Sequence, residues 1–278
     1  MTEELNRKYQ ALKDYFKDLG SATIAFSSGV DSTLMLKVAH DVLGNRAIAV
    51  TARSHSFPAK EKTEASDFCK KEGIEHVFID SEELNIPGFT QNPKNRCYLC
   101  KRELFERIIE VAGQHNIPHV CEGSNLDDNG DYRPGLQAIA ELGVKSPLRE
   151  CNLWKSEIRA ISKELGLDTW KKQSFACLAS RFVYGETISV EKLDMVDKAE
   201  QLLIDLGFVQ ERVRIHSFGN GETSGTIARI EVNPDEFQKL LENHETIVSE
   251  FKKIGFNYVS MDLQGYRTGS MNETLNLL

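Results

Sequence analysis

The stretch Ala22-Thr-Ile-Ala-Phe-Ser-Ser-Gly-Val-Asp-Ser-Thr33 decides the fold of this chain. Its first five residues are small or apolar, and they predict a buried strand that ends where Ser27 begins a polar loop. The apolar residues from Met35 to Leu43 recur at helical spacing, and Gly44 is suited to end the helix. The stretch therefore predicts a strand, a short loop and a helix in direct succession.

The same order of elements repeats around this stretch. We expect an amphipathic helix over 5–19, strands over 47–51, 76–80 and 119–123, and helices over 58–71, 98–112, 136–142 and 155–165. Strands that alternate with helices form right-handed crossovers and a parallel sheet. The sequence thus predicts an α/β fold with a doubly wound parallel sheet, whose ligand lies beyond the carboxyl ends of the strands.

The pattern changes near residue 185. A helix over 190–206 precedes strands over 212–216 and 226–232, a helix over 234–253 and a last strand over 257–264. These elements predict a smaller C-terminal α+β domain. The expected domains are residues 1–184, which carry the strand–loop–helix stretch, and residues 185–278, which serve substrate binding or oligomerisation. A homo-oligomer is expected.

Composition limits the class of protein. The 278 residues carry a net charge of −8, whereas proteins that neutralise many phosphates are usually basic, so we expect no nucleic-acid partner. No segment approaches the roughly 18 uninterrupted apolar residues of a membrane helix. The start Met1-Thr-Glu-Glu lacks the apolar core of a signal peptide. We therefore expect a cytoplasmic protein, without a membrane partner, whose cysteines are thiols or ligands rather than disulfides.

The loop between the first strand and its helix is suited to bind phosphate. Backbone amides at a helix N-terminus lack carbonyl partners and attract anions. Gly29 permits close approach of the backbone, and Asp31 is placed either to hold Mg²⁺ or to cap the helix. Further hydroxyl donors come from Ser27, Ser32 and Thr33. Neither a Walker A lysine nor a G-x-G-x-x-G pattern is present. Taken alone, the loop favours an ordinary Asp or Ser helix cap.

Two cysteines share the start of a predicted helix in Cys97-Tyr-Leu-Cys100, followed by Lys101 and Arg102. A helix N-terminus and nearby cations lower the pKa of a thiol, which favours thiolates for metal or sulfur chemistry. Cys177 lies far downstream. Three thiolates are one short of a closed zinc site, and they would suit an iron–sulfur cluster with one open iron. Spacing alone leaves a cluster, a completed zinc site and a redox dithiol open.

Two further pairs of residues are candidates for ligand binding. Arg212 and Arg214 lie two apart on a predicted strand, so both point to one face, where guanidinium groups would suit the phosphate of a mononucleotide. Solvated surface arginines are the alternative. Ser124 and Asn125 follow the strand over 119–123, at the edge where a parallel sheet binds its ligand. A polar turn explains that pair equally well.

Other residues are expected to have no part in chemistry. Cys69 and Cys121 lie among apolar residues of a helix and a strand, and both are expected in the core. Cys151 lies in a loop and is undecided. Glu200 lies on the amphipathic helix over 190–206, where a solvated carboxylate is expected.

With these pieces in place, the chain resembles known enzymes. Ser27-Ser-Gly-Val-Asp-Ser32 is similar to the S-G-G-x-D-S loop of the PP-loop ATP pyrophosphatase superfamily, with Ser28 where that pattern has its second glycine. Over nearly the whole chain it resembles the LarE family of pyridinium-3,5-biscarboxylic acid mononucleotide sulfurtransferases. The stretches that carry this resemblance include Asn95-Arg-Cys-Tyr-Leu-Cys-Lys101, Glu122-Gly-Ser-Asn125, Asp131-Tyr-Arg-Pro-Gly135, Cys177-Leu-Ala-Ser-Arg-Phe182 and Arg212-Val-Arg214.

The resemblance implies a two-step reaction. ATP would activate a substrate carboxylate as its adenylate and release pyrophosphate, after which sulfur would displace AMP to give a thiocarboxylate. It implies catalytic roles for Asp31, Lys101 and Cys177. It places ATP with Mg²⁺ on Ser27, Ser28, Gly29, Asp31, Ser32, Thr33, Ser124 and Asn125, and the mononucleotide substrate on Arg181, Arg212 and Arg214.

The resemblance also bears on the source of sulfur. Members of the family either sacrifice the sulfur of one cysteine or hold a [4Fe-4S] cluster that passes on an extra sulfide. Cys97, Cys100 and Cys177 match the second kind, which we predict here, with single use of Cys177 as the alternative. The sequence points to no particular sulfide donor.

Two other functions remain as alternatives. A tRNA thiolase can also join a PP-loop to three cysteines, but the acidic charge and the lack of a basic segment interleaved with aromatics count against it. A non-catalytic nucleotide-binding redox module would bind ATP or AMP without turnover. An ammonia-using amidotransferase would leave the three cysteines unexplained.

Overall fold

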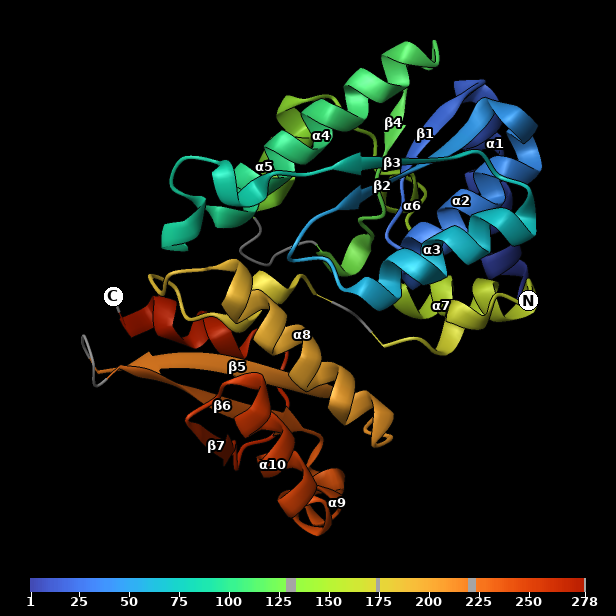
Figure 1. Cartoon of the computed structure of the whole chain (residues 1–278). Coiled ribbons are helices and arrows are strands. Elements are labelled where there is room, and N and C mark those ends of the chain that lie inside the picture. The colour runs from blue at the N-terminus through green and yellow to red at the C-terminus, as the bar shows by residue number, and fades with distance from the viewer. Residues whose placement is uncertain (129–133, 174–175, 220–223, 278) are drawn as a thin grey trace. The chain divides into compact units, whose positions relative to one another are not determined.

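The computed structural model describes residues 1–128, 134–173, 176–219 and 224–277, and Figure 1 shows the whole chain. The chain divides into two compact units, one formed by residues 1–83 and 95–175 and the other by residues 84–94 and 176–278. The predicted division into domains of residues 1–184 and 185–278 stays a prediction. Asp131-Tyr-Arg133, part of a stretch that carries the family resemblance, lies outside the described residues.

A four-stranded parallel sheet forms the centre of the first unit. Its order is β3-β2-β1-β4, and in the register between the two central strands Ala22 pairs with Ala47 and Ala25 with Val50. The strands are β1 (Ala22–Ala25), β2 (Ala47–Arg53), β3 (His76–Asp80) and β4 (Val120–Cys121). These agree with the predicted positions, although the last strand is shorter than expected.

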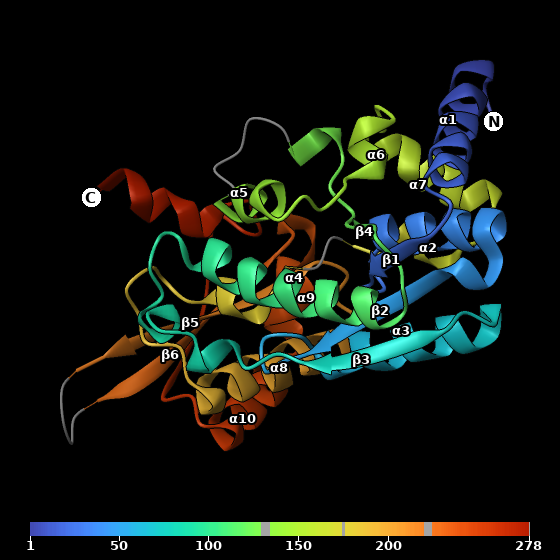
Figure 2. The same cartoon turned by 90° about the horizontal axis from the view of Figure 1, so that it is seen from above.

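Helices cover both faces of this sheet, as the two hydrophobic cores of the unit show (Figure 2). Along β2, Ala47 and Ala49 belong to one core, while Ile48 and Val50 belong to the other, because successive strand residues point to opposite faces. The first core contains residues of α1 (Glu3–Leu19), α2 (Val30–Leu43), α3 (Ala59–Glu72), α6 (Pro147–Glu150) and α7 (Lys155–Glu164). The second contains residues of α4 (Arg96–Gln114) and α5 (Pro134–Glu141). The predicted doubly wound α/β fold is confirmed.

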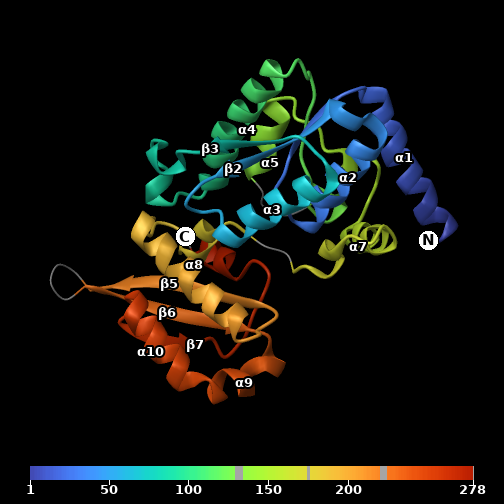
Figure 3. The same cartoon turned by 45° about the vertical axis from the view of Figure 1, so that its right-hand side comes forward.

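The second unit is built on a three-stranded sheet (Figure 3). Its strands are β5 (Glu211–Phe218), β6 (Gly225–Val232) and β7 (Tyr258–Met261), with the first pair antiparallel and the second parallel. The helix α8 (Val190–Asp205) contacts β5 and α10 (His244–Ile254). This mixed arrangement agrees with the predicted smaller α+β part.

One predicted helix is wrong in its extent. The helix expected over 234–253 is divided at Asn243 into α9 (Phe237–Glu242) and α10. The Asn243 side chain donates to the carbonyl of Lys239 at 2.8 Å. Asparagine side chains compete in this way with backbone hydrogen bonds, and helices tend to end there. Among the helices of the described residues, none is long and apolar enough to cross a membrane.

Candidate active site

The predicted phosphate-binding loop around Ser27–Gly29, called the phosphate loop, lies between the end of β1 and the start of α2. The helix is preceded by Gly29, and no side chain of the described residues caps its first amides. The Ser32 hydroxyl instead accepts from the backbone N–H of Ser27 at 3.3 Å. The Thr33 hydroxyl is buried without a hydrogen-bond partner among the described residues. The ordinary helix cap is therefore wrong, and the loop presents unpaired donors of the kind that bind phosphate.

Asp31 lies in the first turn of α2 and is held by residues from elsewhere in the unit. Its carboxylate contacts the ammonium of Lys155 and accepts from the side-chain amide of Asn125 at 3.3 Å. Burial raises the pKa of Asp31, and the charge of Lys155 only partly offsets this effect. The carboxylate thus has a cation beside it in the position where Mg²⁺ was expected.

The loop after β4 packs directly against this helix start. Gly123 lies so close that a Cβ there would be 3.2 Å from the Cβ of Asp31. Both the backbone N–H and the hydroxyl of Ser124 donate to the buried carboxylate of Glu122, at 3.0 and 2.8 Å. The structure thus brings Ser124 and Asn125 to the phosphate loop. The sequence did not predict that the Glu122 carboxylate holds Ser124 there.

Asp127 and Asp128 fix the turn that contains Asn125. The Asp128 carboxylate accepts from the backbone N–H of Asn125 at 2.9 Å, and the Asn125 side-chain oxygen accepts from the N–H of Asp127 at 2.9 Å. Asp127 also accepts from the first N–H of α7, at Lys155. This turn joins the two residues that contact Asp31.

Cys97 and Cys100 lie one turn apart at the start of α4, so their side chains share one face of the helix. The Arg96 guanidinium lies 3.8 Å from the Cys97 sulfur, and the Cys100 sulfur lies 3.8 Å from the carboxylate of Glu83. Two thiols on one helix face fit a shared metal centre. Cys177 belongs to the second unit, and within the described residues no group of three or more His, Cys, Asp or Glu side chains is placed to hold a metal.

Lys101 follows the two thiols on the same helix. Its side chain runs along Gly135, where an added Cβ would lie 2.7 Å from its Cδ. Burial disfavours the thiolate form of the other three thiols. Burial raises the pKa of Cys69 and of Cys121 to about 12, and both lie in the first core as predicted. Burial also raises the pKa of Cys151 to about 11, and this residue packs against the same core.

A cluster of buried charges lies beside Cys177 in the second unit. Arg181, in the 3₁₀ helix η6 (Leu178–Arg181), is fully buried and forms a two-pronged ion pair with Glu200 of α8, each prong 2.8 Å long. Its third nitrogen donates to the carbonyl of Ala176 at 2.9 Å. Burial alone would raise the pKa of Glu200, but the charge and hydrogen bonds of Arg181, the charge of Arg212 and the backbone N–H of Val213 together outweigh burial and lower the pKa. Arg181 therefore anchors the segment that carries Cys177.

Arg212 and Arg214 lie on β5 within the same cluster, and both are buried. Arg214 donates to the carboxylate of Glu231 at 2.8 Å and to the hydroxyl of Ser270 at 3.1 Å. The Arg212 guanidinium lies over the ring of Tyr266, 5.3 Å from its centroid. The surface alternative for these arginines is wrong, because their side chains face the interior of the unit.

Burial of so many charges changes the ionisation of two neighbours. Burial and the nearby charge of Glu200 raise the pKa of Glu211 to about 8. Burial and the nearby guanidinium of Arg181 lower the pKa of Arg212. Like charges therefore lie near one another in the cluster. Such shifted pKa values are typical of functional sites.

The expectation for Glu200 is wrong. Its side chain is buried with 2% exposure instead of solvated. A signal was present in the sequence, because Glu200 falls on the same helical stripe as the buried residues Leu193, Val196 and Leu203. A carboxylate in such a stripe requires a buried cation, which Arg181 supplies.

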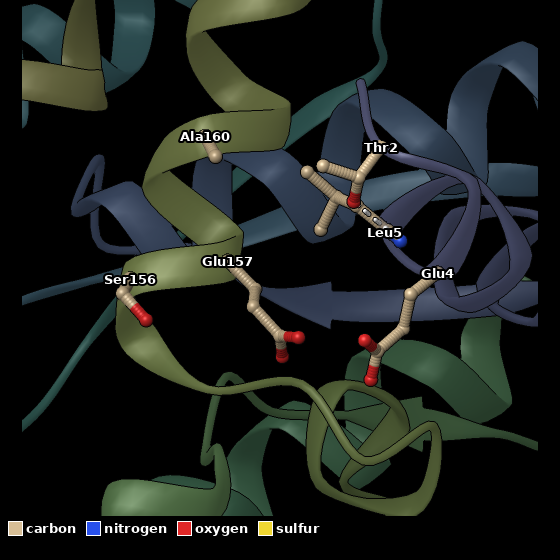
Figure 4. Close-up of a pocket in the computed structure, with 6 residues that line it drawn as sticks. All are labelled: Thr2, Glu4, Leu5, Ser156, Glu157 and Ala160. Atoms are coloured by element: carbon tan, nitrogen blue, oxygen red, sulfur yellow. Dashed lines mark hydrogen bonds between the residues drawn. The ribbon is translucent and has the colours of Figure 1, made fainter.

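A separate hollow of about 170 Å³ lies between the starts of α1 and α7. It is lined by Thr2, Glu4, Leu5, Ser156, Glu157 and Ala160 (Figure 4). The Glu157 carboxylate already binds Lys8 and the backbone N–H of Trp154. Two carboxylates in this hollow would repel phosphate, so it is not a candidate for the nucleotide.

Comparisons with known proteins agree with this arrangement. No family model matches the chain. It is 43% identical to an uncharacterized protein of Synechocystis over 98% of this chain and 99% of that protein. It is 35% identical to the pyridinium-3,5-bisthiocarboxylic acid mononucleotide synthase of Lactiplantibacillus plantarum, over 98% of this chain and 96% of that enzyme. It is 31% identical to one of the subunits of a glutamine-hydrolysing GMP synthase of Archaeoglobus fulgidus, over 69% of this chain and 66% of that polypeptide. The chain therefore belongs to the LarE-type family of pyridinium-3,5-bisthiocarboxylic acid mononucleotide synthases, within the PP-loop superfamily of ATP-using enzymes.

Proposed function

We propose that this chain uses ATP to adenylate a carboxylate of pyridinium-3,5-biscarboxylic acid mononucleotide and then replaces AMP with sulfur. The observation that carries the proposal is the start of α2, where the described part of the chain supplies neither a side-chain cap nor a partner for the Thr33 hydroxyl one turn inside the helix. These donors suit the phosphates of ATP. The substrate is inferred from the Lactiplantibacillus plantarum relative, whose name is that of a bisthiocarboxylic acid mononucleotide synthase.

The chemistry balances in two steps. A substrate carboxylate oxygen attacks the α-phosphorus of ATP, and the bond to the departing pyrophosphate breaks. The sulfur of a hydrosulfide then attacks the acyl carbon, the bond to the AMP oxygen breaks, and loss of the sulfur-bound proton gives the thiocarboxylate. If the Cys177 thiolate attacks instead, a thioester forms, and elimination across the Cα–Cβ bond of Cys177 breaks its Cβ–S bond to leave the thiocarboxylate and dehydroalanine. Ser27–Thr33 with Ser124 and Asn125 would hold ATP, and Asp31 would hold Mg²⁺ in exchange for its contact with Lys155. Lys101 would offset negative charge that develops at the adenylate.

The arginines of the second unit are proposed to bind the phosphate of the mononucleotide. Arg212 and Arg214 share one face of β5, and guanidinium groups bind phosphate through paired, charge-assisted hydrogen bonds. Arg181 is proposed to serve the same substrate by holding the backbone of the Cys177 segment, since one of its nitrogens donates to the carbonyls of both Ala176 and Cys177.

Cys97, Cys100 and Cys177 are proposed to hold a [4Fe-4S] cluster. When bound, such a cluster would supply an extra sulfide at its open iron. The shared helix face of Cys97 and Cys100 supports two of the three ligands. Arg96, next to Cys97, supplies positive charge that suits a thiolate.

Product analysis tests the proposal. Protein purified without oxygen, incubated with ATP and the biscarboxylate mononucleotide, should release AMP and pyrophosphate in equal amounts. Asp31→Ala should abolish AMP formation with the fold intact, because the Mg²⁺ ligand is lost. Asp41→Ala provides a matched control on the same helix, where Asp41 pairs with Lys37 in an exposed i,i+4 contact. Release of ADP and phosphate would refute the reaction class.

A further inference from the structure

Ser28 adopts an unusual backbone conformation in the phosphate loop. Its φ is 53°, in the left-handed region, and the residue is buried. A side chain makes this region costly, whereas glycine enters it freely. Ser28 stands where the PP-loop pattern has a glycine, so this chain needs something to compensate for the serine.

Two charged residues from distant parts of the first unit contact Ser28. Its hydroxyl donates to the carboxylate of Glu61, in the first turn of α3, at 2.7 Å. The ammonium of Lys172 donates to the carbonyl of Ser28 at 3.2 Å and to the same Glu61 oxygen at 2.6 Å. Lys172 also contacts the carboxylate of Glu64, one turn further along α3.

These contacts reach the hydroxyl and the carbonyl of Ser28. The Glu61 carboxylate fixes the hydroxyl, and Lys172 fixes the carbonyl, so the serine is held on both sides of its Cα. Glu61 is buried beside a loop that is suited to bind anions. The positive charge of Lys172 offsets the repulsion that the Glu61 carboxylate would otherwise exert on phosphate.

We propose that Lys172 and Glu61 are positioning residues that clamp Ser28 in the left-handed conformation and thereby keep the phosphate loop ready for ATP. The inference rests on the proposed use of this loop for ATP. Without the clamp, only a fraction of molecules would hold the loop in the binding conformation, and the apparent affinity would fall by that fraction.

A different role for Lys172 makes a different prediction. If its ammonium bound the phosphates of ATP directly, its loss would weaken binding whatever residue stood at position 28. If it acts through Ser28, its loss should matter little once glycine stands there, because glycine needs no clamp.

A double-mutant cycle separates the two roles. The variants are Lys172→Met, Ser28→Gly and both together, and the measurement is the calorimetric dissociation constant of α,β-methylene-ATP, which cannot be cleaved between its α and β phosphates. We expect Lys172→Met to weaken binding about tenfold in the wild-type background. In the Ser28→Gly background the same change should weaken binding less than about twofold. Lys172→Arg should restore most of the affinity, and Lys171→Met, at the exposed neighbouring lysine, should have no effect.

Three results would overturn the clamp. One is an equal loss of affinity in both backgrounds, which would make Lys172 a direct phosphate ligand. The others are unchanged binding by Lys172→Met and failure of Lys172→Arg to restore the affinity. If Lys172→Met does not fold, Glu61→Gln combined with Lys172→Met removes both charges together and is measured in the same two backgrounds. Wild-type protein that binds the analogue but forms no AMP from ATP would refute the proposed reaction and leave the cycle readable.

Discussion

Arg181 and Glu200 form a two-pronged ion pair in the second unit, with nitrogen–oxygen distances of 2.8 Å and side-chain exposures of 0% and 3%. The same arginine donates to the carbonyls of Ala176 and Cys177, at 2.9 and 3.4 Å. A charge on α8 therefore fixes the backbone of the segment that carries the proposed sulfur site.

Removal of one partner should be costly. Glu200→Ala would leave the Arg181 charge buried without its carboxylate, so we expect a loss of about 3–5 kcal/mol in the free energy of unfolding. Urea unfolding measures this loss. Glu250→Ala provides the control, because its ion pair with Lys253 is exposed and should contribute less than about 0.5 kcal/mol. A loss at Glu200 no larger than at Glu250 would show that the pair does not stabilise the fold.

Glu211 should make stability depend on pH. Burial and the charge of Glu200 raise the pKa of Glu211 to about 8. Between the ordinary pKa of glutamate and about 8, the unfolded chain releases this proton while the folded chain keeps it. Stability therefore falls as pH rises through that window.

Glu211→Gln should lack this fall, because its side chain is always neutral. Relative to wild type, its free energy of unfolding should rise by about 2.5–4 kcal/mol between about pH 5 and pH 8. Glu242→Gln, at an exposed position of α9, should show no such trend. A difference between Glu211→Gln and wild type that does not vary with pH would mean that Glu211 is ionised in the folded protein.

Replacement of Arg212 should weaken binding of the mononucleotide substrate and leave binding of ATP unchanged. A charge-assisted hydrogen bond to phosphate contributes about 1.5–3 kcal/mol, so Arg212→Gln should weaken binding of the mononucleotide by about tenfold to a hundredfold. Binding of ATP analogues, measured by calorimetry on the same preparation, should be unchanged. Equal mononucleotide affinities of the variant and wild type would assign Arg212 a structural role. Tight, salt-sensitive binding of tRNA would favour a tRNA thiolase instead.

The three proposed cluster ligands should act together. Replacement of Cys97, Cys100 or Cys177 by Ser should abolish the iron content, the cluster absorbance and sulfur transfer, while AMP formation continues. Cys69→Ser and Cys121→Ser, at buried core positions, should cost stability alone. Iron-free protein that transfers sulfur once per chain, with loss of one H₂S from Cys177, would contradict the cluster and support single use of that cysteine.

Local patterns in the sequence sufficed for most of the fold. The apolar run of β1 and the helical spacing of α2 predicted the strand, the loop and the helix, because neighbouring residues determine the periodicity of each element. Alternation of strands and helices then predicted the parallel sheet. The division at Asn243 was missed because the competing hydrogen bond of a side chain does not alter the apolar period.

The sequence by itself determined the α/β fold, the place of the phosphate loop and the family resemblance, since all of these follow from short contiguous stretches. Only the tertiary structure decided which opposite charge each buried charge pairs with. Glu200 and Arg181 are 19 residues apart, and Lys172 and Ser28 are 144 residues apart. No local period encodes such pairs. They form because a buried charge requires an opposite charge nearby, and folding decides which charge that is.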